Sequence, residues 1–541
     1  QPAWDELMRR DSQCFVNTIA VLAFALCLLD PSPAQSQPNA SPTSAQLGIN
    51  LAGPKDWATE LPFVDVFRTS RPWISQREGA GWGQGPELDV DDFGWVKELQ
   101  PGCYAESMLC TISGGHYPSG IYTVLYEGEG DLEFGKGPRV VEATPGRIRI
   151  AVDSAQGGFS LQIRKTNPNN YIRNIHVIMP GFEKTWRQNP FHPVFIGRWR
   201  GMACFRFMDW MHTNHSEIAA WEDRPTLRHA TFSKHGVALE WMIELCNRTH
   251  VDPWFCMPHL ADDDFIRSFA TMVKERLDPT LKIYVEYSNE VWNGQFEQSR
   301  YAGRQGVKLG LAPEDKPWEA GWHFTAVRSL QIFDIWEDVF RGHDRLIRVL
   351  PTQSANPRVS EAILSFRQAA SHADALAVAP YMPFSVGRGK RKDLAEQMDD
   401  WNVDQLLDFF EETAFQESLD RMNQNKEVAD KYGLSLIAYE GGQHMAAFVN
   451  DRDRIERLTE TMQQANRHPR MGDLYRRYFD HWKSIGGGTF AVFSSISRWS
   501  NHGAWGLAEF YDSQPAEYSK LEAVLQWAKQ QGQPVNLSIH D

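Results

Sequence analysis

The chain is poor in cysteine and in positive charge for its length. Its 541 residues include seven Cys, and Asp and Glu outnumber Lys and Arg by 69 to 55, which gives a formal net charge of −14 at pH 7. A surface of this sign repels phosphate backbones and anionic headgroups, which argues against nucleic acid and membranes as partners. The 20 Trp residues instead offer flat apolar faces, which serve core packing and also suit neutral sugar rings.

The few cysteines form no recognisable metal site. No Cys-x-x-Cys motif occurs, and no Cys and His residues have zinc-site spacing. Two cysteines fall in an N-terminal apolar segment and five follow it, namely Cys103, Cys110, Cys204, Cys246 and Cys256. Cys103 and Cys110 bracket a short segment that we interpret as a loop, and they could pair in an oxidising compartment. The other three lie in apolar patterns typical of buried thiols.

Motifs for several other chemistries are also missing. There is no Gly-x-Ser-x-Gly elbow, no Gly-rich phosphate loop that opens a helix and no internal repeat. The acidic run at residues 262–264 lacks the alternation and the glycine of a calcium loop. It opens a predicted helix, whose positive dipole end favours acidic side chains. We therefore expect no metal and no cofactor.

The N-terminal segment has the pattern of an export signal. A basic segment, Met8-Arg9-Arg10, precedes the apolar run FVNTIAVLAFALCLL and the polar exit DPSPAQSQ. The run is shorter than the ~20 apolar residues of a membrane span, so we predict a signal with its upstream residues over 1–36, cleaved near Ala34 to Ser36. A retained anchor or a lipidated Cys27 is the alternative. Residues 37–46 form a flexible Pro/Ser-rich leader, and the mature chain is expected to be secreted or periplasmic.

Beyond the leader, the sequence predicts an α/β fold with an insertion. Residues 86–181 form short alternating segments separated by turn residues, a pattern typical of a β-sandwich. Elsewhere, apolar strands alternate with helical stretches, and we count eight strands, with FVDVFRTS as the first. This predicts a (β/α)8 TIM barrel with a β-sandwich inserted after its first strand. The barrel would occupy residues 47–85 and 182–530, followed by a C-terminal tail at 531–541.

Two of the predicted strands end on a glutamate. The fourth, in YVEYSNE, ends on Asn289 and Glu290, and the seventh, in LSLIAYEGG, ends on Glu440 before two glycines. Active groups of such barrels project from the C-terminal ends of the strands. Two carboxyl groups across one mouth suit glycosidic cleavage, because one protonates the leaving oxygen while the other meets the cation-like anomeric carbon. Taken singly, a glutamate at a strand end is more often a salt-bridge partner or a helix cap than a catalyst, and it is the joint placement of the two that favours catalysis.

With the motifs YSNEVWN and AYEGG, the sequence resembles the clan A glycoside hydrolases. These are retaining barrel enzymes with an Asn-Glu pair on strand four and a glutamate on strand seven, and the cellulase-type families are the most similar. The resemblance implies that Glu290 is the general acid/base, that Glu440 is the nucleophile and that Asn289 binds the sugar 2-hydroxyl. It covers the barrel but not the β-sandwich.

The resemblance extends less specifically to three other strand ends. It implies that Arg206 in CFRFMDW keeps the nucleophile ionised, that His259 in MPHLADDD lines the sugar subsite and that Tyr381 in APYMP bonds the nucleophile. A structural ion pair and a core histidine are the alternatives for Arg206 and His259. Ala379 stands where the family commonly has a histidine, so the chain departs from the pattern there.

Three tryptophans are candidates for sugar platforms. Trp499 in SRWSNHGAW fits an aromatic floor at strand eight, and Trp505 in the same segment competes with it for this role. Trp292 is either a further platform or a residue of loop packing.

Together these observations predict a retaining glycosidase acting on a neutral β-linked polysaccharide, in the first place a β-glucan such as cellulose cut internally. A mannan- or xylan-active hydrolase is one alternative, and a non-catalytic carbohydrate-binding protein on a barrel scaffold is another. Because the acid must be protonated while the nucleophile is ionised, we expect a bell-shaped pH profile with an optimum on the acid side of neutral.

Overall fold

The computed structural model describes residues 45–538, which contain a closed barrel of eight parallel strands. Each strand pairs with its neighbours in chain order, and the first also pairs with the last, so the barrel sheet has no open edge. The strands are β1 (Leu47–Asn50), β12 (Cys204–Arg206), β13 (Asp252–Met257), β14 (Ile283–Tyr287), β15 (Leu346–Pro351), β16 (Ala375–Val378), β18 (Ser435–Ala438) and β20 (Phe490–Val492). The predicted barrel is confirmed.

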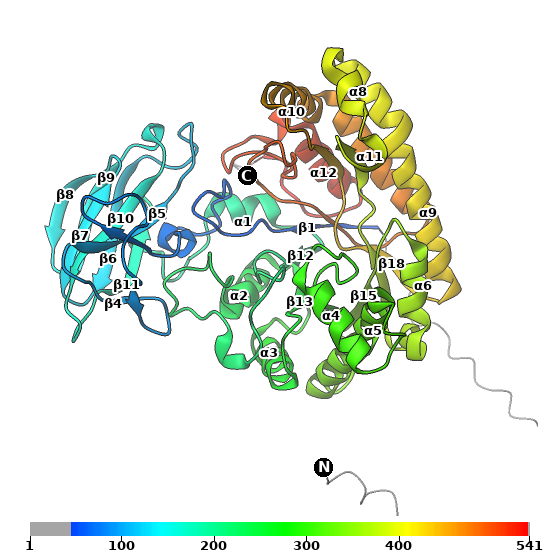
Figure 1. Ribbon diagram of the computed structural model, residues 1–541, viewed down its shortest axis with the longest axis horizontal. Helices are drawn as coiled ribbons and strands as arrows, with labels where there is room; N and C mark the ends of the chain where they lie inside the picture. The colour runs from blue at the N-terminus through cyan, green and yellow to red at the C-terminus, as the bar shows by residue number, and fades with distance from the viewer. Residues whose placement is uncertain (1–44, 539–541) are drawn as a thin grey trace, which may run out of the picture. The chain divides into compact units, whose positions relative to one another are not determined.

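Helices alternate with these strands along the chain (Figure 1). Asp262 caps α3 by accepting a hydrogen bond from the backbone N–H of Phe265 at 2.7 Å, the kind of role expected for the acidic run. The main helices are α1 (Pro193–Trp199), α2 (Leu239–Thr249), α3 (Asp263–Arg276), α4 (Glu297–Lys308), α5 (Pro317–Phe340), α6 (Pro357–Ser365), α8 (Val403–Phe410), α9 (Gln416–Lys431), α10 (Arg452–Arg467), α11 (Pro469–Ser484) and α12 (Ser519–Gln530).

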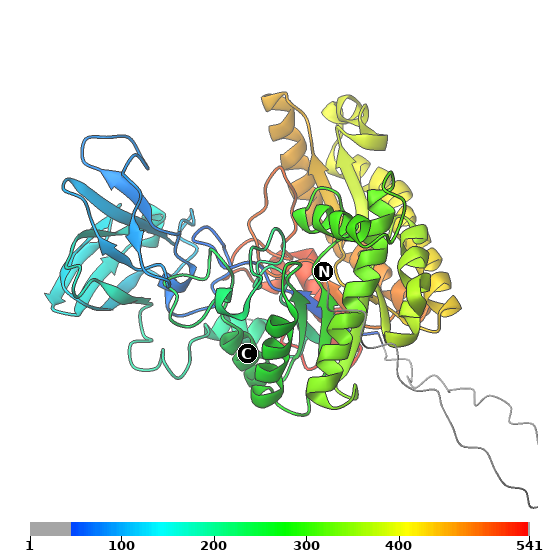
Figure 2. The same cartoon turned by 60° about the horizontal axis from the view of Figure 1, so that its bottom comes forward.

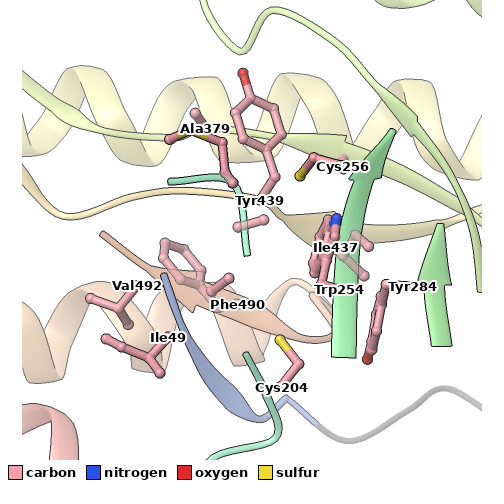
Figure 3. Packing of buried hydrophobic residues seen from close by; sticks show 14 of the residues in the cluster. Ile49, Cys204, Trp254, Cys256, Tyr284, Ala379, Ile437, Tyr439, Phe490 and Val492 are labelled. Carbon is pink, nitrogen blue, oxygen red and sulfur yellow. The ribbon is translucent and has the colours of Figure 1, made fainter. Parts of the chain in front are cut away.

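Apolar side chains of the short strands form the barrel core. Helices cover a parallel sheet of this kind, so its strands are buried and carry mostly apolar residues. Every residue of β14 and of β16 is buried. Figure 3 shows side chains of this core, among them Ile49, Trp254 and Phe490 from three strands. The rings of Trp254 and Tyr284, on adjacent strands, stack with their centroids 4.8 Å apart. A charged side chain within such strands therefore requires a partner in the interior.

The insert between β1 and β12 contains two four-stranded antiparallel sheets, blue to cyan in Figures 1 and 2. It has a buried cluster separate from the main core of the barrel, so it is a β-sandwich with its own core. One sheet contains β2 (Ile74–Arg77), β5 (Cys103–Leu109), β10 (Phe159–Thr166) and β7 (Gly130–Gly135). The other contains β11 (Arg173–Ile178), β6 (Gly120–Glu127), β9 (Arg147–Val152) and β8 (Arg139–Thr144). The sandwich thus includes β2, which precedes residue 86.

Hydrogen bonds join the insert to the long segment between β12 and α2. Trp95 donates from Nε1 to the carbonyl of Arg228 at 3.1 Å, and the backbone N–H of Ala230 donates to the carbonyl of Phe93 at 2.9 Å. Arg68, just before the insert, donates to the carbonyl of His229 at 2.8 Å. The segment that leaves the second barrel strand is therefore held against the sandwich.

Two predictions about local structure are wrong. The first barrel strand lies in QLGINLAG, whereas FVDVFRTS contains a 3-10 helix (Val66–Thr69), capped by Asp65, whose side chain accepts a hydrogen bond from Phe67. Cys103 and Cys110 do not bracket a loop, because strand β5 runs between them. A strand rises about 3.3 Å per residue, so their Cα atoms are too far apart for a disulfide. Both are buried free thiols.

The predicted export signal and residues 37–44 of the leader lie outside the described residues. Between residues 45 and 538, no helix has the length and apolar character needed to cross a bilayer. The same residues contain no group of three or more His, Cys, Asp or Glu side chains arranged to hold a metal ion.

Candidate active site

Arg206, at the end of β12, lies at the centre of a buried polar network. Its side chain has no exposed surface, and all five of its N–H groups donate hydrogen bonds. Two of them form a bidentate pair with Glu286 of β14, both at 3.0 Å. The others reach Asn50 at 3.1 Å, Asn289 at 2.9 Å and Glu440 at 2.8 Å. The ends of four strands are thereby fixed around one guanidinium group.

Glu440 follows β18 and receives two hydrogen bonds. Arg206 donates to its Oε1 at 2.8 Å, and the hydroxyl of Tyr381 donates to its Oε2 at 2.9 Å. Burial raises the pKa of Glu440, while Arg206 and Tyr381 oppose that rise by stabilising the carboxylate. The turn behind it requires glycine, because Gly442 has φ +136° and a Cβ on Gly441 would lie 2.3 Å from the ring of Phe490.

Glu290 follows β14 in an unusual backbone conformation. Both Ser288 (φ +57°) and Glu290 (φ +43°) adopt left-handed values that side-chain-bearing residues rarely take. The only side-chain hydrogen bond to its carboxyl among the described residues comes from the neutral amide of Asn293, at 2.8 Å. Burial, followed by the charge of Glu440, raises the pKa of Glu290 to about 8. The negative charge of Glu440 thus favours the protonated form of Glu290.

The surroundings of the two glutamates are unequal. Glu440 faces a guanidinium and a phenol, whereas Glu290 faces an amide, so a single negative charge on the pair is more stable on Glu440. Glu290 and Tyr381 each keep part of their surface exposed, which leaves the pair accessible from solvent. One protonated and one ionised carboxyl group is the combination that acid-assisted bond cleavage requires.

Asn289 is held in place by groups on both sides. Its Oδ1 accepts from Arg206, and its Nδ2 donates to Oδ1 of Asn214 at 3.0 Å. Gln298 of α4 supports the same arrangement by donating to Asn214 and to the carbonyl of Asn289. One N–H of the Asn289 amide remains available for a ligand.

The aromatic candidates divide into two groups. Trp505 packs edge-on against Tyr381, with ring centroids 5.8 Å apart, and is half-buried beside the glutamate pair. Trp292 is also half-buried, and its Nε1 donates to the hydroxyl of Tyr439 at 3.3 Å. Trp499 is 3% exposed and packs instead against the buried ammonium of Lys520. The first choice for the strand-eight platform is therefore corrected, because Trp499 lies in the core and Trp505 lies beside Tyr381.

His259, which follows β13, is buried and neutral. Burial lowers its pKa to about 4. Its ring packs edge-on against Tyr301, and its Nδ1 has no hydrogen-bond partner among the described residues. The ring borders an open pocket of about 550 Å³ that also contains Tyr301 and Arg328.

Three polar residues of the site escaped the sequence analysis. Glu286 and Asn50 hold Arg206 from two sides. Asp209, three residues after Arg206, is a further carboxyl group near the pair, and burial followed by the charge of Glu440 raises its pKa to about 6. Glu286 could have been predicted from the sequence, because a charged residue inside the apolar run IYVEY has to be paired in the interior. Asn50 would have emerged from the strand-end rule if the first strand had been located correctly.

Comparisons with known proteins found similarity in structure and none in sequence. No protein-family model matches the chain, and no curated protein matches it. The GH51 arabinofuranosidase from Xanthomonas axonopodis pv. citri shares 11% identity over 61% of this chain, with a TM-score of 0.35. The match spans 65% of the arabinofuranosidase, a little under two thirds of its length. The CBM22-1–GH10 modules of Clostridium thermocellum xylanase 10B share 9% identity over 87% of this chain and 97% of their own, with a TM-score of 0.35.

A third structure, native xylanase 10B from Thermotoga maritima, shares 12% identity over 61% of this chain and 88% of its own, with a TM-score of 0.31. These are likenesses of fold, and the roles of individual residues depend on the geometry described above. The three solved structures are an arabinofuranosidase and two xylanases.

Proposed function

We propose that the protein is a retaining glycoside hydrolase that cleaves a neutral β-linked polysaccharide, with a β-glucan as the first substrate to test and internal cleavage as the mode. The observation that carries the proposal is the unequal hydrogen bonding of two strand-end glutamates, since a guanidinium and a phenol donate to Glu440 and an amide donates to Glu290. The net charge of −14 supports a neutral substrate, since it disfavours anionic polymers.

In the first step, Glu290 gives its proton to the glycosidic oxygen while the Glu440 carboxylate attacks the anomeric carbon. The bond between that carbon and the oxygen breaks, the leaving chain departs as an alcohol, and a glycosyl ester of Glu440 forms. In the second step, Glu290, now ionised, takes a proton from water as the water oxygen attacks the same carbon. Glu440 leaves as a carboxylate, and the configuration at the anomeric carbon is retained.

The hydrogen bonds around the pair suit these roles. Arg206 and Tyr381 both donate to Glu440, which favours the ionised form needed for attack and for departure. The raised pKa of Glu290 keeps its proton available near neutral pH. Asn289, fixed by Arg206 and Asn214, has a free N–H to bind a hydroxyl next to the cleaved bond, a contact that can strengthen in the transition state.

The test is the release of reducing ends from β-glucan, mannan and xylan by the wild type, Glu290→Gln and Glu440→Gln. We expect hydrolysis of at least one polymer by the wild type and a loss of about 10³-fold or more in each variant. Undiminished activity in either variant would refute the mechanism. Binding of polymer without any release of sugar by the wild type would instead identify a carbohydrate-binding protein.

The stereochemical outcome gives a second measurement. Proton NMR during the first minutes of hydrolysis should show the β-anomer of the new reducing end before mutarotation. An initial α-anomer would mean inversion, and with it a water between the two carboxyl groups.

A secreted or periplasmic location is part of the proposal and rests on the sequence pattern of residues 1–36. Mass spectrometry of the protein expressed from its full sequence should find a mature N-terminus near Ala34 to Ser36. An intact N-terminal segment in the cell membrane fraction would favour a retained anchor.

A further inference from the structure

A groove of about 570 Å³ lies where the insert meets the segment between β12 and α2. Trp73, Asp92 and Phe93 line it from the insert, and Glu217, Glu222 and Lys234 line it from the β12–α2 segment. Its size falls within the range of ~300–1,000 Å³ typical of small-molecule sites. Hydrogen bonds between the two walls, such as that from Ala230 N–H to the Phe93 carbonyl, fix its shape.

The lining combines aromatic rings with polar groups that have no internal partner. Trp73 and Phe93 are half-buried, and the guanidinium of Arg228 lies over the Phe93 ring, 3.8 Å from its centroid. Glu217, Glu222 and Lys234 are exposed and form no side-chain hydrogen bond or ion pair with any described residue. Sugars present C–H faces to rings and hydroxyl groups to carboxylates and ammonium groups, so this lining suits a hydroxyl-rich neutral ligand.

The acidic side chains of the lining disfavour anionic ligands of similar size. Acidic side chains stand on both walls of the groove, Asp92 on one and Glu217 with Glu222 on the other. Carboxylates on both sides repel phosphate groups and the uronic acids of anionic polysaccharides. A neutral saccharide has no such penalty.

The loop after β1 lies against both the segment that lines the groove and Asp209. Lys55, in the loop after β1, donates from Nζ to the carbonyl of Ser233, next to Lys234 of the groove. Asp209 lies beside the same loop, since a Cβ on Gly53 would be 3.5 Å from its own Cβ. Asp209 also interacts with Glu440 and Lys55, whose charges act on its pKa in opposite directions. Lys55 thus contacts the segment that lines the groove, and its loop packs against Asp209, three residues after Arg206.

We propose that this groove binds sugar units of the same polymer at a distance from the cleaved bond, so that the inserted β-sandwich forms one wall of an extended substrate site. This inference rests on the proposed function for the identity of the polymer. It assigns Glu217 and Lys234 to substrate binding, and it predicts that long chains are bound better than short ones because only long chains reach the groove.

The test compares two double variants that remove the same charges. In the first, Glu217→Ala is combined with Lys234→Ala. In the control, Lys308→Ala at the end of α4 is combined with Glu314→Ala, and these two residues are likewise exposed. Neither pair has a side-chain partner in the described chain, so we expect both proteins to fold, with an unchanged Tm as the check.

Activity is measured as kcat/KM on an aryl cellobioside and on cellohexaose. The loss of two hydrogen-bonding side chains should lower kcat/KM for cellohexaose about tenfold in the groove variant and leave the aryl cellobioside unaffected. The control variant should match the wild type on both. An equal effect on the two substrates, or no effect on cellohexaose, would overturn the inference while leaving the proposed hydrolase intact.

A binding measurement keeps the groove testable if no hydrolysis is found. Calorimetric titration of Glu440→Gln with cellohexaose, xylohexaose and mannohexaose should detect binding of at least one. Adding the groove substitutions should weaken that binding about tenfold, and adding the control substitutions should not. Binding unchanged by the groove substitutions, or no binding of any of the three hexasaccharides, would refute the inference.

Discussion

Arg206 donates to Glu440 at 2.8 Å from a position with no exposed surface, and the same guanidinium holds Glu286 with two further hydrogen bonds. The ion pair therefore joins the candidate nucleophile to the interior of the barrel. A buried charge of this kind is costly when its partner is removed, because the remaining ions cannot be resolvated.

The first prediction concerns this arginine. Arg206→Met should lower the free energy of unfolding by about 3–5 kcal/mol, since Glu286 and Glu440 both lose their cation. Urea unfolding measures the change, and Arg348→Met is the matched control. Arg348 pairs with Asp374 and Glu337 on the barrel but has no contact with the glutamate pair. Its loss should destabilise the protein and leave the pH profile of activity unchanged, whereas any active Arg206 variant should show an acid limb at higher pH.

Tyr381→Phe removes one hydrogen bond to Glu440 and little else. A hydrogen bond to a charged group contributes about 1.5–3 kcal/mol, so kcat/KM should fall by about 10- to 150-fold. The hydroxyl lowers the pKa of Glu440, and its removal should move the acid limb of the pH profile upward. A variant with full activity and an unmoved acid limb would show that Tyr381 does not act on Glu440.

The pH profile of kcat/KM should be bell-shaped, with Glu440 setting the acid limb and Glu290 the alkaline limb. Because the pKa of Glu290 is raised to about 8, activity should be lost as the pH rises through that value. Burial places the acid limb above the ordinary glutamate pKa of 4.5. The optimum lies between these two limbs. An alkaline limb that persists in Glu290→Gln at residual activity would exclude Glu290 as its source.

Glu290→Gln should also change how stability depends on pH. The folded protein holds the Glu290 proton up to about pH 8, while the unfolded chain releases it near the ordinary pKa of 4.5. Folded wild type therefore loses stability as pH rises between these values, and the variant lacks that loss. In urea unfolding, the unfolding free energy of the variant minus that of the wild type should be more positive at pH 9 than at pH 5. A difference that is the same at both pH values would contradict the raised pKa.

The two tryptophans after β20 make a contrasting pair. Trp505→Ala should raise KM or lower kcat on oligosaccharides with little loss of stability, because this half-buried ring lies beside Tyr381. Trp499→Ala should cost about 3–5 kcal/mol of unfolding free energy, because its buried ring packs on Lys520 and Tyr518. Steady-state kinetics and thermal unfolding of both proteins measure the difference. A purely kinetic effect of Trp499→Ala would reverse the assignment.

The barrel was predictable because its strands are apolar and their spacing is regular. The strand-end rule led to Glu290 and Glu440, whereas Tyr381 followed from the family resemblance. The first strand was misplaced because four residues, Leu47–Asn50, give too short a pattern to compete with the alternating FVDVFRTS. Tertiary contacts favour the 3-10 helix in FVDVFRTS, because Asp65 caps this helix and also accepts a hydrogen bond from His176 of the insert at 2.7 Å.

The direction of a side chain in a loop was beyond the sequence pattern. Trp499 and Trp505 lie six positions apart in one loop, and neither periodicity nor composition distinguishes the ring that enters the core from the ring that meets Tyr381. The groove beside the insert could not be predicted from the sequence either, because its two walls come from segments more than a hundred residues apart that carry no shared motif.

The pairing of β1 has a consequence for biosynthesis. Leu47 and Ile49 align with Phe490 and Val492 of β20, so the barrel cannot close until β20 has left the ribosome. The insert has its own core and can fold long before that. During elongation, unpaired edges of the growing parallel sheet would therefore be exposed next to an already folded sandwich, and this is the period in which the nascent chain most needs a chaperone.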